Sequence, residues 1–442
     1  MGYWAVDPTD EAKYGRIRDR AYVKTLVAAA LIGVPVALLA IAFTSAVHGI
    51  EELLWHEIPE EAGWTEPAWW YVLAVPAAGG ALVAAALRLP GKGGHPAIEG
   101  LSLKPMRPLE VMSVLAASLA TLGFGLVLGP EAPLMALGLT FGLVAAHVVR
   151  LDGENARDLV FAGAFAALAS ILGGPLIAAF MLFELVAASG TIPSARIGHM
   201  LVPGFIAGGT GYLVFLGVND WPGLDAPALA LGGLPAYNSV QLVDVAWCLA
   251  LAAVVAVLVV ASRRIAWRTL SLSAGRPTAA LVLAGLAVGA LAVAFRALTD
   301  RPVDLVLFSG QAALPEALLE DSAGVLALLV VAKMLAYGIS LGAGFRGGPI
   351  FPAIAIGVFT GVLAASVLPG LELTPAVLAG VAAGAAAGLK LPFIGALMAG
   401  LLGGAASVDA IPITIIAAVV AWLVTLALDH PVESQQHEEV TT

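Results

Sequence analysis

Long stretches of this sequence carry no Asp, Glu, Lys or Arg, and they narrow the possible folds sharply. They include residues 26–47, 111–130, 132–149, 159–183, 197–219, 245–262, 277–295, 347–371, 391–408 and 410–428. A helix needs about 20 apolar residues to cross a bilayer, and most of the stretches come near that length. Strands of a membrane barrel would instead be about 10 residues of alternating character. The sequence therefore predicts an all-α polytopic membrane protein.

Composition excludes the other broad classes. Of the 442 residues, 60% are hydrophobic and 12% are charged, where a soluble domain has about 25% charged residues. Low charge and high hydrophobicity also exclude a disordered chain. The single cysteine, Cys248, excludes a disulfide framework and a multi-cysteine metal site, and we expect no metal and no cofactor. The net charge of −10 argues against a nucleic-acid partner.

Charged residues between the apolar stretches predict the orientation in the membrane. Basic residues precede the first stretch, and they are Lys13, Arg16, Arg18, Arg20 and Lys24. Because basic loops stay in the cytoplasm, we expect the N-terminus to be cytoplasmic, in a plasma (inner) membrane protein. The connection 51–66 is acid-rich and is expected outside, whereas 263–276 carries four arginines and is expected inside.

An internal repeat divides the chain near its middle. Residues 129–142 (GPEAPLMALGLTFG) match residues 348–361 (GPIFPAIAIGVFTG), 219 positions later, and residues 162–181 resemble 379–398. The repeat predicts four segments along the chain. They are a cytoplasmic N-terminal segment (1–24), a first transmembrane repeat (25–235), a second transmembrane repeat (236–429) and a short polar tail (430–442) without a regulatory domain.

Each copy of Gly-Pro-x-x-Pro lies inside an apolar stretch and predicts a helix that begins there. Pro is favoured in the first turn of a helix, so helices should start near Glu131 and Ile350. Broken helices at membrane depth are tolerated where they line a cavity. Their free N–H groups favour an anion. Two such ends related by a repeat predict an anion transport site, although Gly-Pro kinks also occur in ordinary membrane helices.

Glu131 is the ionisable residue that this pattern singles out. It stands between uncharged stretches at a predicted helix start, where a carboxylate would compete with an anion and leave the site when protonated. The alternative is a simple helix cap. Arg346 could attract anions or anchor at the surface, Glu184 could face a cytoplasmic vestibule or form a structural pair, and Lys333 is expected to snorkel at a helix end.

Three motifs, in order, resemble those of the CLC family of chloride channels and proton-coupled chloride transporters. Residues 92–100 (KGGHPAIEG) resemble its G-S-G-I-P element, 125–138 (GLVLGPEAPLMALG) its G-R-E-G-P element, and 345–357 (FRGGPIFPAIAIG) its G-I-F-x-P element. The segment 175–185 (PLIAAFMLFEL) resembles the helix between them. The resemblance covers nearly the whole transmembrane region.

The resemblance implies a fold and a set of site residues. The fold consists of two inverted-topology repeats whose broken helices meet at the membrane midplane, with one pathway per subunit and usually a homodimer. Glu131 matches the gating glutamate. The implied anion-binding residues are Gly93, Gly94, Glu131, Ala132, Ile350 and Phe351.

Several family positions are changed in this chain. The serine whose hydroxyl contacts the central anion falls at Gly93, and one of two central backbone amides falls at Pro349, which has no N–H. The inner proton-relay glutamate falls at Leu185, beside Glu184, and the inner tyrosine falls near Glu433. Glu184, Leu185 and Glu433 thus define an expected inner pathway.

The function that this sequence favours is passage of a small inorganic anion, chloride first, through a CLC-type pore gated by Glu131. Passive conduction is preferred because Leu185 removes the usual inner proton carrier. The alternative is anion/proton antiport that uses Glu131 and another inner route, such as water or Glu184. A membrane-embedded enzyme is a more distant alternative, because the sequence holds no His-Glu-x-x-His.

Overall fold

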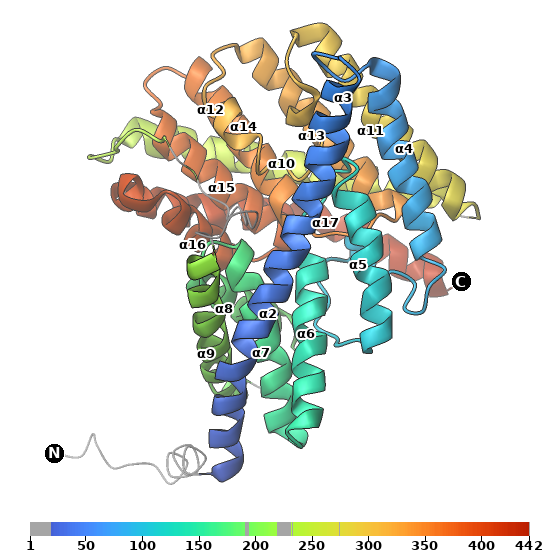
Figure 1. Ribbon diagram of the computed structural model, residues 1–442. Helices are drawn as coiled ribbons and strands as arrows, with labels where there is room; N and C mark the ends of the chain where they lie inside the picture. The colour runs from blue at the N-terminus through green and yellow to red at the C-terminus, as the bar shows by residue number, and fades with distance from the viewer. Residues whose placement is uncertain (1–18, 191–193, 219–230, 232, 274, 442) are drawn as a thin grey trace, which may run out of the picture. The chain divides into compact units, whose positions relative to one another are not determined.

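Helices make up the regular structure of the described chain (Figure 1). The computed structural model describes residues 19–190, 194–218, 231, 233–273 and 275–441, with side chains at all of these except 194–196, 218, 405–407 and 430–441. In chain order the elements are α2 (Arg20–Glu52), the π-helix η2 (Leu53–Glu57), α3 (Ile58–Glu61), α4 (Trp69–Ala86), η3 (Ala97–Glu99), α5 (Pro108–Leu122), α6 (Glu131–Val148), α7 (Gly153–Ile171), α8 (Pro175–Ser189), α9 (Ser194–Val218), α10 (Leu242–Ser273), α11 (Pro277–Thr299), η4 (Val303–Leu305), α12 (Leu314–Leu318), α13 (Ala323–Ala343), α14 (Ile350–Val367), α15 (Leu373–Leu389), α16 (Pro392–Leu402), η5 (Gly404–Ala410) and α17 (Ile411–Thr441).

Nine helical segments of the described chain are long and apolar enough to cross a membrane. They are Arg20–Glu61, Trp69–Ala86, Glu131–Val148, Ile197–Gly217, Leu242–Ser273, Pro277–Thr299, Ala323–Ala343, Ile350–Val367 and Val408–Asp429. The predicted class, an all-α polytopic membrane protein, is confirmed.

Other apolar helices are too short to cross alone. The uncharged stretch 159–183 contains both α7 and the beginning of α8, because Gly173 adopts a positive φ of 80° and Pro175 starts the next helix. The helices α5, α15 and α16 are also short, with 15, 17 and 11 residues. Prolines and glycines inside apolar sequence thus break the crossings into shorter pieces.

The chain forms two compact units. Unit 1 consists of Met1–Ala42, Leu103–Pro108 and Leu134–Ala226, and unit 2 of Phe43–Ser102, Leu109–Pro133 and Pro227–Thr442. In unit 1, α7 packs against α8 and α9 (Figure 1). The first turn of α6, with Glu131, belongs to unit 2 and the rest of this helix to unit 1.

Equivalent glycines of the predicted repeat make equivalent close contacts. In unit 1 a Cβ at Gly138 of α6 would meet the carbonyl oxygen of Gly163 in α7. In unit 2 a Cβ at Gly357 of α14 would meet the carbonyl oxygen of Gly380 in α15. The glycines therefore let the two backbones of each helix pair touch, as small residues do in membrane helix pairs.

Candidate functional site: the junction of two broken helices

The segments before α6 and α14 pair with each other inside unit 2. The N–H of Gly129 donates to the carbonyl of Gly348 at 2.8 Å, and the N–H of Gly348 donates to that of Gly129 at 2.6 Å. These two glycines are the first residues of the matching segments 129–142 and 348–361. The predicted helix starts are confirmed, since α6 begins at Glu131 and α14 at Ile350.

Two hydroxyl groups extend this reciprocal arrangement. Thr121 Oγ1 accepts from the N–H of Arg346, and Ser340 Oγ accepts from the N–H of Val127, both at 3.1 Å. Thr121 and Ser340 are 219 positions apart, as are Val127 and Arg346. A hydroxyl of α5 therefore accepts from the segment before α14, and a hydroxyl of α13 accepts from the segment before α6. These two contacts hold the two segments together.

The carboxyl group of Glu131 lies at the N-terminus of α14. Its side chain is fully buried, and Oε1 accepts from the N–H of Ile350 at 2.6 Å. Oε2 has no hydrogen-bond partner among the described residues. The first N–H groups of a helix have no partner within it and carry a positive partial charge. Glu131 thus supplies a carboxyl oxygen as acceptor to the end of a second helix, at the kind of position where anions bind.

Glycine leaves room on both sides of this carboxyl group. A Cβ at Gly129 would meet Glu131 Oε2, and a Cβ at Gly348 would meet the carboxyl carbon of Glu131. The Gly-Pro pairs that precede α6 and α14 therefore also make room for the Glu131 side chain.

The remaining predicted anion-binding residues of unit 2 lie in the first turns of α6 and α14 and in the loop after α4. Ala132 follows Glu131 in α6, and Ile350 and Phe351 are both buried at the start of α14. Gly93 and Gly94 adopt positive φ values of 71° and 72°. Their N–H groups donate to Ser113 Oγ at 3.1 Å and to the carbonyl of Gly91 at 2.8 Å, respectively.

The expected inner-pathway residues lie elsewhere in the chain. Glu184, which is buried, and Leu185, which is partly buried, belong to α8 in unit 1. Glu433 falls in α17, outside the residues whose side chains the structure describes. Among the described residues, no group of three or more His, Cys, Asp or Glu side chains is arranged to hold a metal ion.

Lys333 does not snorkel, and that expectation was wrong. Its side chain is fully buried in α13, and Nζ donates to the carbonyls of Leu305, Val306, Leu307 and Phe308 at 3.4, 3.1, 2.6 and 3.0 Å. The carbonyls at the end of η4 replace water as partners of the ammonium group. A hydropathy pattern locates a lysine along a helix but not the distant loop that surrounds it.

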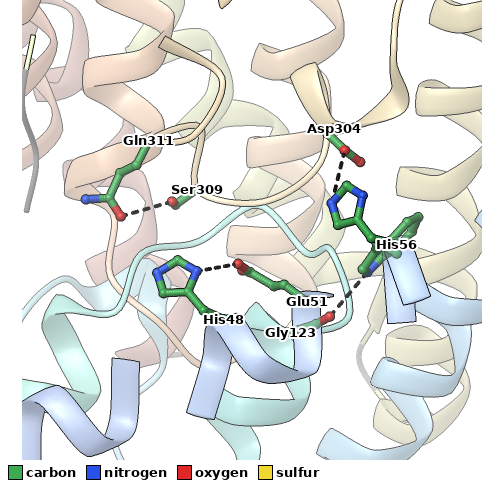
Figure 2. Close-up of polar contacts among 8 residues, drawn as sticks. His48, Glu51, His56, Gly123, Asp304, Ser309 and Gln311 are labelled. Carbon is green, nitrogen blue, oxygen red and sulfur yellow. Dashed lines mark hydrogen bonds and ion pairs between the residues drawn. The ribbon is translucent and has the colours of Figure 1, made fainter. Parts of the chain in front are cut away.

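The loop held by Lys333 also contacts the segment that leads to Glu131. The N–H of Phe308 donates to the carbonyl of Gly125 at 3.2 Å, and the Trp55 indole donates to Gly123 at 3.3 Å. Figure 2 shows this region, with polar pairs between His56 and Asp304 and between His48 and Glu51. The segment 123–125, which leads to α6, is therefore held by Trp55 and by the loop at Phe308, both in unit 2.

This architecture, with apolar crossing helices and two helix starts joined at a buried carboxyl group, defines a multi-pass membrane protein built on broken helices. The chain belongs to the voltage-gated chloride channel family, whose model matches residues 79–426. The resemblance to the CLC family is thereby confirmed.

An individual relative and two solved structures are also similar to this chain. The "Putative ion-transport protein YfeO" of Salmonella choleraesuis is 28% identical over 357 residues, which cover 78% of this chain and 81% of the relative. The structure of a slow cyanobacterial Cl⁻/H⁺ antiporter matches with a TM-score of 0.73 at 20% identity, over 91% of this chain and 94% of that one. A CLC-type fluoride/proton antiporter matches with a TM-score of 0.65 at 19% identity, over 90% and 95% of the two chains. The two structural matches establish a shared fold.

Proposed function

We propose that this protein moves a small inorganic anion, chloride first, across the membrane, and that Glu131 is its gate. The observation that carries the proposal is the 2.6 Å hydrogen bond from the N–H of Ile350 to Glu131 Oε1. An anion that reached the start of α14 would need the donor that the carboxylate occupies. Protonation of Glu131 would weaken this hydrogen bond and let the anion take its place.

We prefer passive conduction to coupled exchange. Leu185 is apolar and cannot carry a proton from the inner side toward Glu131. The alternative is anion/proton antiport, and it has two supports. The two solved structures named above are antiporters. Glu184, an ionisable residue next to Leu185, is buried in α8 and could carry protons instead.

An efflux experiment with a proton readout tests both modes. The purified protein is reconstituted in liposomes loaded with chloride, and chloride efflux and internal pH are recorded together against protein-free liposomes. Conduction predicts chloride efflux without proton movement against its gradient. Uphill proton movement driven by chloride would establish antiport, and absence of anion efflux would contradict the transport function itself.

The assembly, location and repeat boundaries belong to the same proposal. We propose a homodimer with one pathway in each subunit, in the inner membrane, with a cytoplasmic N-terminus and with repeats at 25–235 and 236–429. Family members are transporters or channels, so no enzymatic activity is proposed. Crosslinking in native membranes, followed by gel filtration in detergent, measures the number of subunits.

A further inference from the structure

Arg346 is a buried cation beside the proposed anion pathway. It lies four residues before Ile350 in the loop that leads into α14, and its exposed fraction is 9%. Four residues span at most about 14 Å, so its backbone is close to the helix start that binds Glu131. A guanidinium stays charged at any physiological pH, which makes a buried one costly unless a negative or polar group faces it.

The side chain is only partly satisfied by the protein. Nη1 donates to the carbonyl of Gly344 at 3.1 Å and Nη2 to that of Lys92 at 3.3 Å. Nε is buried and has no hydrogen-bond partner among the described residues. These contacts hold the guanidinium between two loops and leave the buried Nε–H unused.

The unused donor lies next to Gly93. A Cβ built on Gly93 would be 2.9 Å from Arg346 Nε. Gly93 has no side chain of its own, and its N–H already donates to Ser113. The Leu87 side chain closes the other side of this point, because its Cδ2 would clash with the same Cβ. The guanidinium, rather than a side chain or amide of residue 93, is therefore the group able to donate at this point.

Glu99 is the acidic residue that interacts with Arg346, and it offsets little of the charge on the guanidinium. Glu99 interacts with it electrostatically, but its side chain is 53% exposed and lies 3.4 Å from His95 Nε2. Water screens an exposed carboxylate strongly. Glu99 therefore offsets little of the buried positive charge of Arg346.

We infer that Arg346 is an anion-binding residue that takes over, at Gly93, the role of a side-chain hydroxyl. Its Nε–H and positive charge bind a small monovalent inorganic anion such as chloride or nitrate on the way to α14. The inference rests on the proposed transport function, and it assigns the affinity and selectivity of the site to a charged group. A permanent charge with a directed N–H binds anions more strongly than a neutral hydroxyl does.

Arg346→Met tests this assignment, with Arg88→Met as the matched control. Arg88 is an exposed arginine five residues before Gly93, so its removal changes the net charge by the same amount. Chloride binding to the purified proteins is measured by titration calorimetry, and the permeability order of chloride, nitrate and fluoride is measured in liposomes. We expect Arg346→Met to lose about tenfold or more in chloride affinity and to change the permeability order. Arg88→Met should resemble the wild type.

A purely structural role makes a different prediction. If Arg346 only ties Gly344 to Lys92, Arg346→Met lowers stability or rate but keeps the chloride affinity and permeability order, and that result overturns the inference. Should Arg346→Met fail to fold, Arg346→Lys keeps the charge but removes the Nε–H. We then expect a changed nitrate-to-chloride permeability ratio, and an unchanged ratio overturns the inference. A wild type that binds chloride but moves no anion contradicts the proposed function, while the binding comparison still decides the role of Arg346.

Discussion

At the scale of single residues, Glu131 connects the starts of two helices. It begins α6, and its carboxyl group reaches the first N–H of α14. An N-terminal helix cap normally accepts hydrogen bonds from its own helix. Here the acceptor serves a different helix, from the second copy of the repeat. The contact to Ile350 therefore caps α14 with a residue of α6, at the point where the proposed gate would compete with an anion.

Glu131→Gln is expected to remove the pH dependence of anion flux and to leave folding intact. Glutamine keeps the shape and a carbonyl acceptor for Ile350 but has no proton to gain or lose. Flux is measured in liposomes over a pH series, with Glu60→Gln, an exposed acidic residue of α3, as the control. A variant whose rate and pH response both equal those of the wild type would show that Glu131 is not the gate.

Glu320 gives a pH-dependent contribution to stability outside the crossing helices. Burial opposes its ionisation, but the Ser322 N–H at 2.8 Å and Arg301 at 2.7 Å outweigh this effect and hold its pKa below the usual value. A lowered folded-state pKa stabilises the protein above the unfolded-state pKa, and the stabilisation is lost as pH falls through the folded-state value.

Glu320→Gln should therefore lower the thermal midpoint at pH 7 and have less effect in acid. The expected cost is about 1 kcal/mol or less, because Arg301 is partly exposed to solvent. Thermal unfolding in detergent is followed at several pH values for Glu320→Gln, Arg301→Gln and the double variant. Equal losses at acidic and neutral pH, or fully additive losses in the double variant, would contradict a stabilising ion pair.

The residues of the site differ in how far sequence predicts them. Glu131 and the starts of α6 and α14 follow from an isolated charge and from prolines in apolar sequence, which are local signals. The contact of Arg346 with Gly93 joins residues 253 positions apart and has no local signal. The hydroxyls of Thr121 and Ser340 could have been found, because they obey the 219-residue offset already visible in the repeat.

At the scale of helices, glycine positions determine how closely each pair packs. In α14 and α15, a Cβ at Gly357 or at Gly380 would meet the carbonyl of the other residue. The matching pair in α6 and α7, Gly138 and Gly163, has the same geometry. Sequence shows such spacing but not which glycines face each other, since spaced glycines are common in membrane helices.

Gly357→Ala is expected to destabilise the protein by about 1–3 kcal/mol, because backbone rather than a flexible side chain obstructs the new methyl group. Gly324→Ala in α13 is the control, since the nearest atom to a Cβ there is Ser322 Oγ at 3.9 Å. Thermal midpoints in detergent compare the two variants. A Gly357→Ala protein as stable as Gly324→Ala would mean that α14 and α15 do not pack this closely.

At the scale of the whole molecule, the direction of α4 and α11 bears on which charged connections face the same side of the membrane. The connections are 51–66 before α4 and 263–276 before α11. A Cβ at Gly80 would meet Leu281, and one at Gly289 would meet Val72, so the two helices run antiparallel (Figure 1). The acid-rich connection before α4 and the arginine-rich segment before α11 therefore lie at opposite ends of this pair. Sequence assigned these segments to opposite sides from charge alone, and the packing is consistent with that assignment.

Cysteine labelling tests the direction of the whole chain across the membrane. The single native cysteine, Cys248, is buried, and Cys248→Ser provides a background without thiols. In that background, Glu61→Cys and Ser271→Cys place one thiol at an exposed position near each charged connection. Because basic segments remain in the cytoplasm, an impermeant maleimide added outside intact cells should label position 61 and leave position 271 unlabelled until the membrane is opened. The reverse pattern would invert the proposed orientation, and with it the side from which anions reach Arg346.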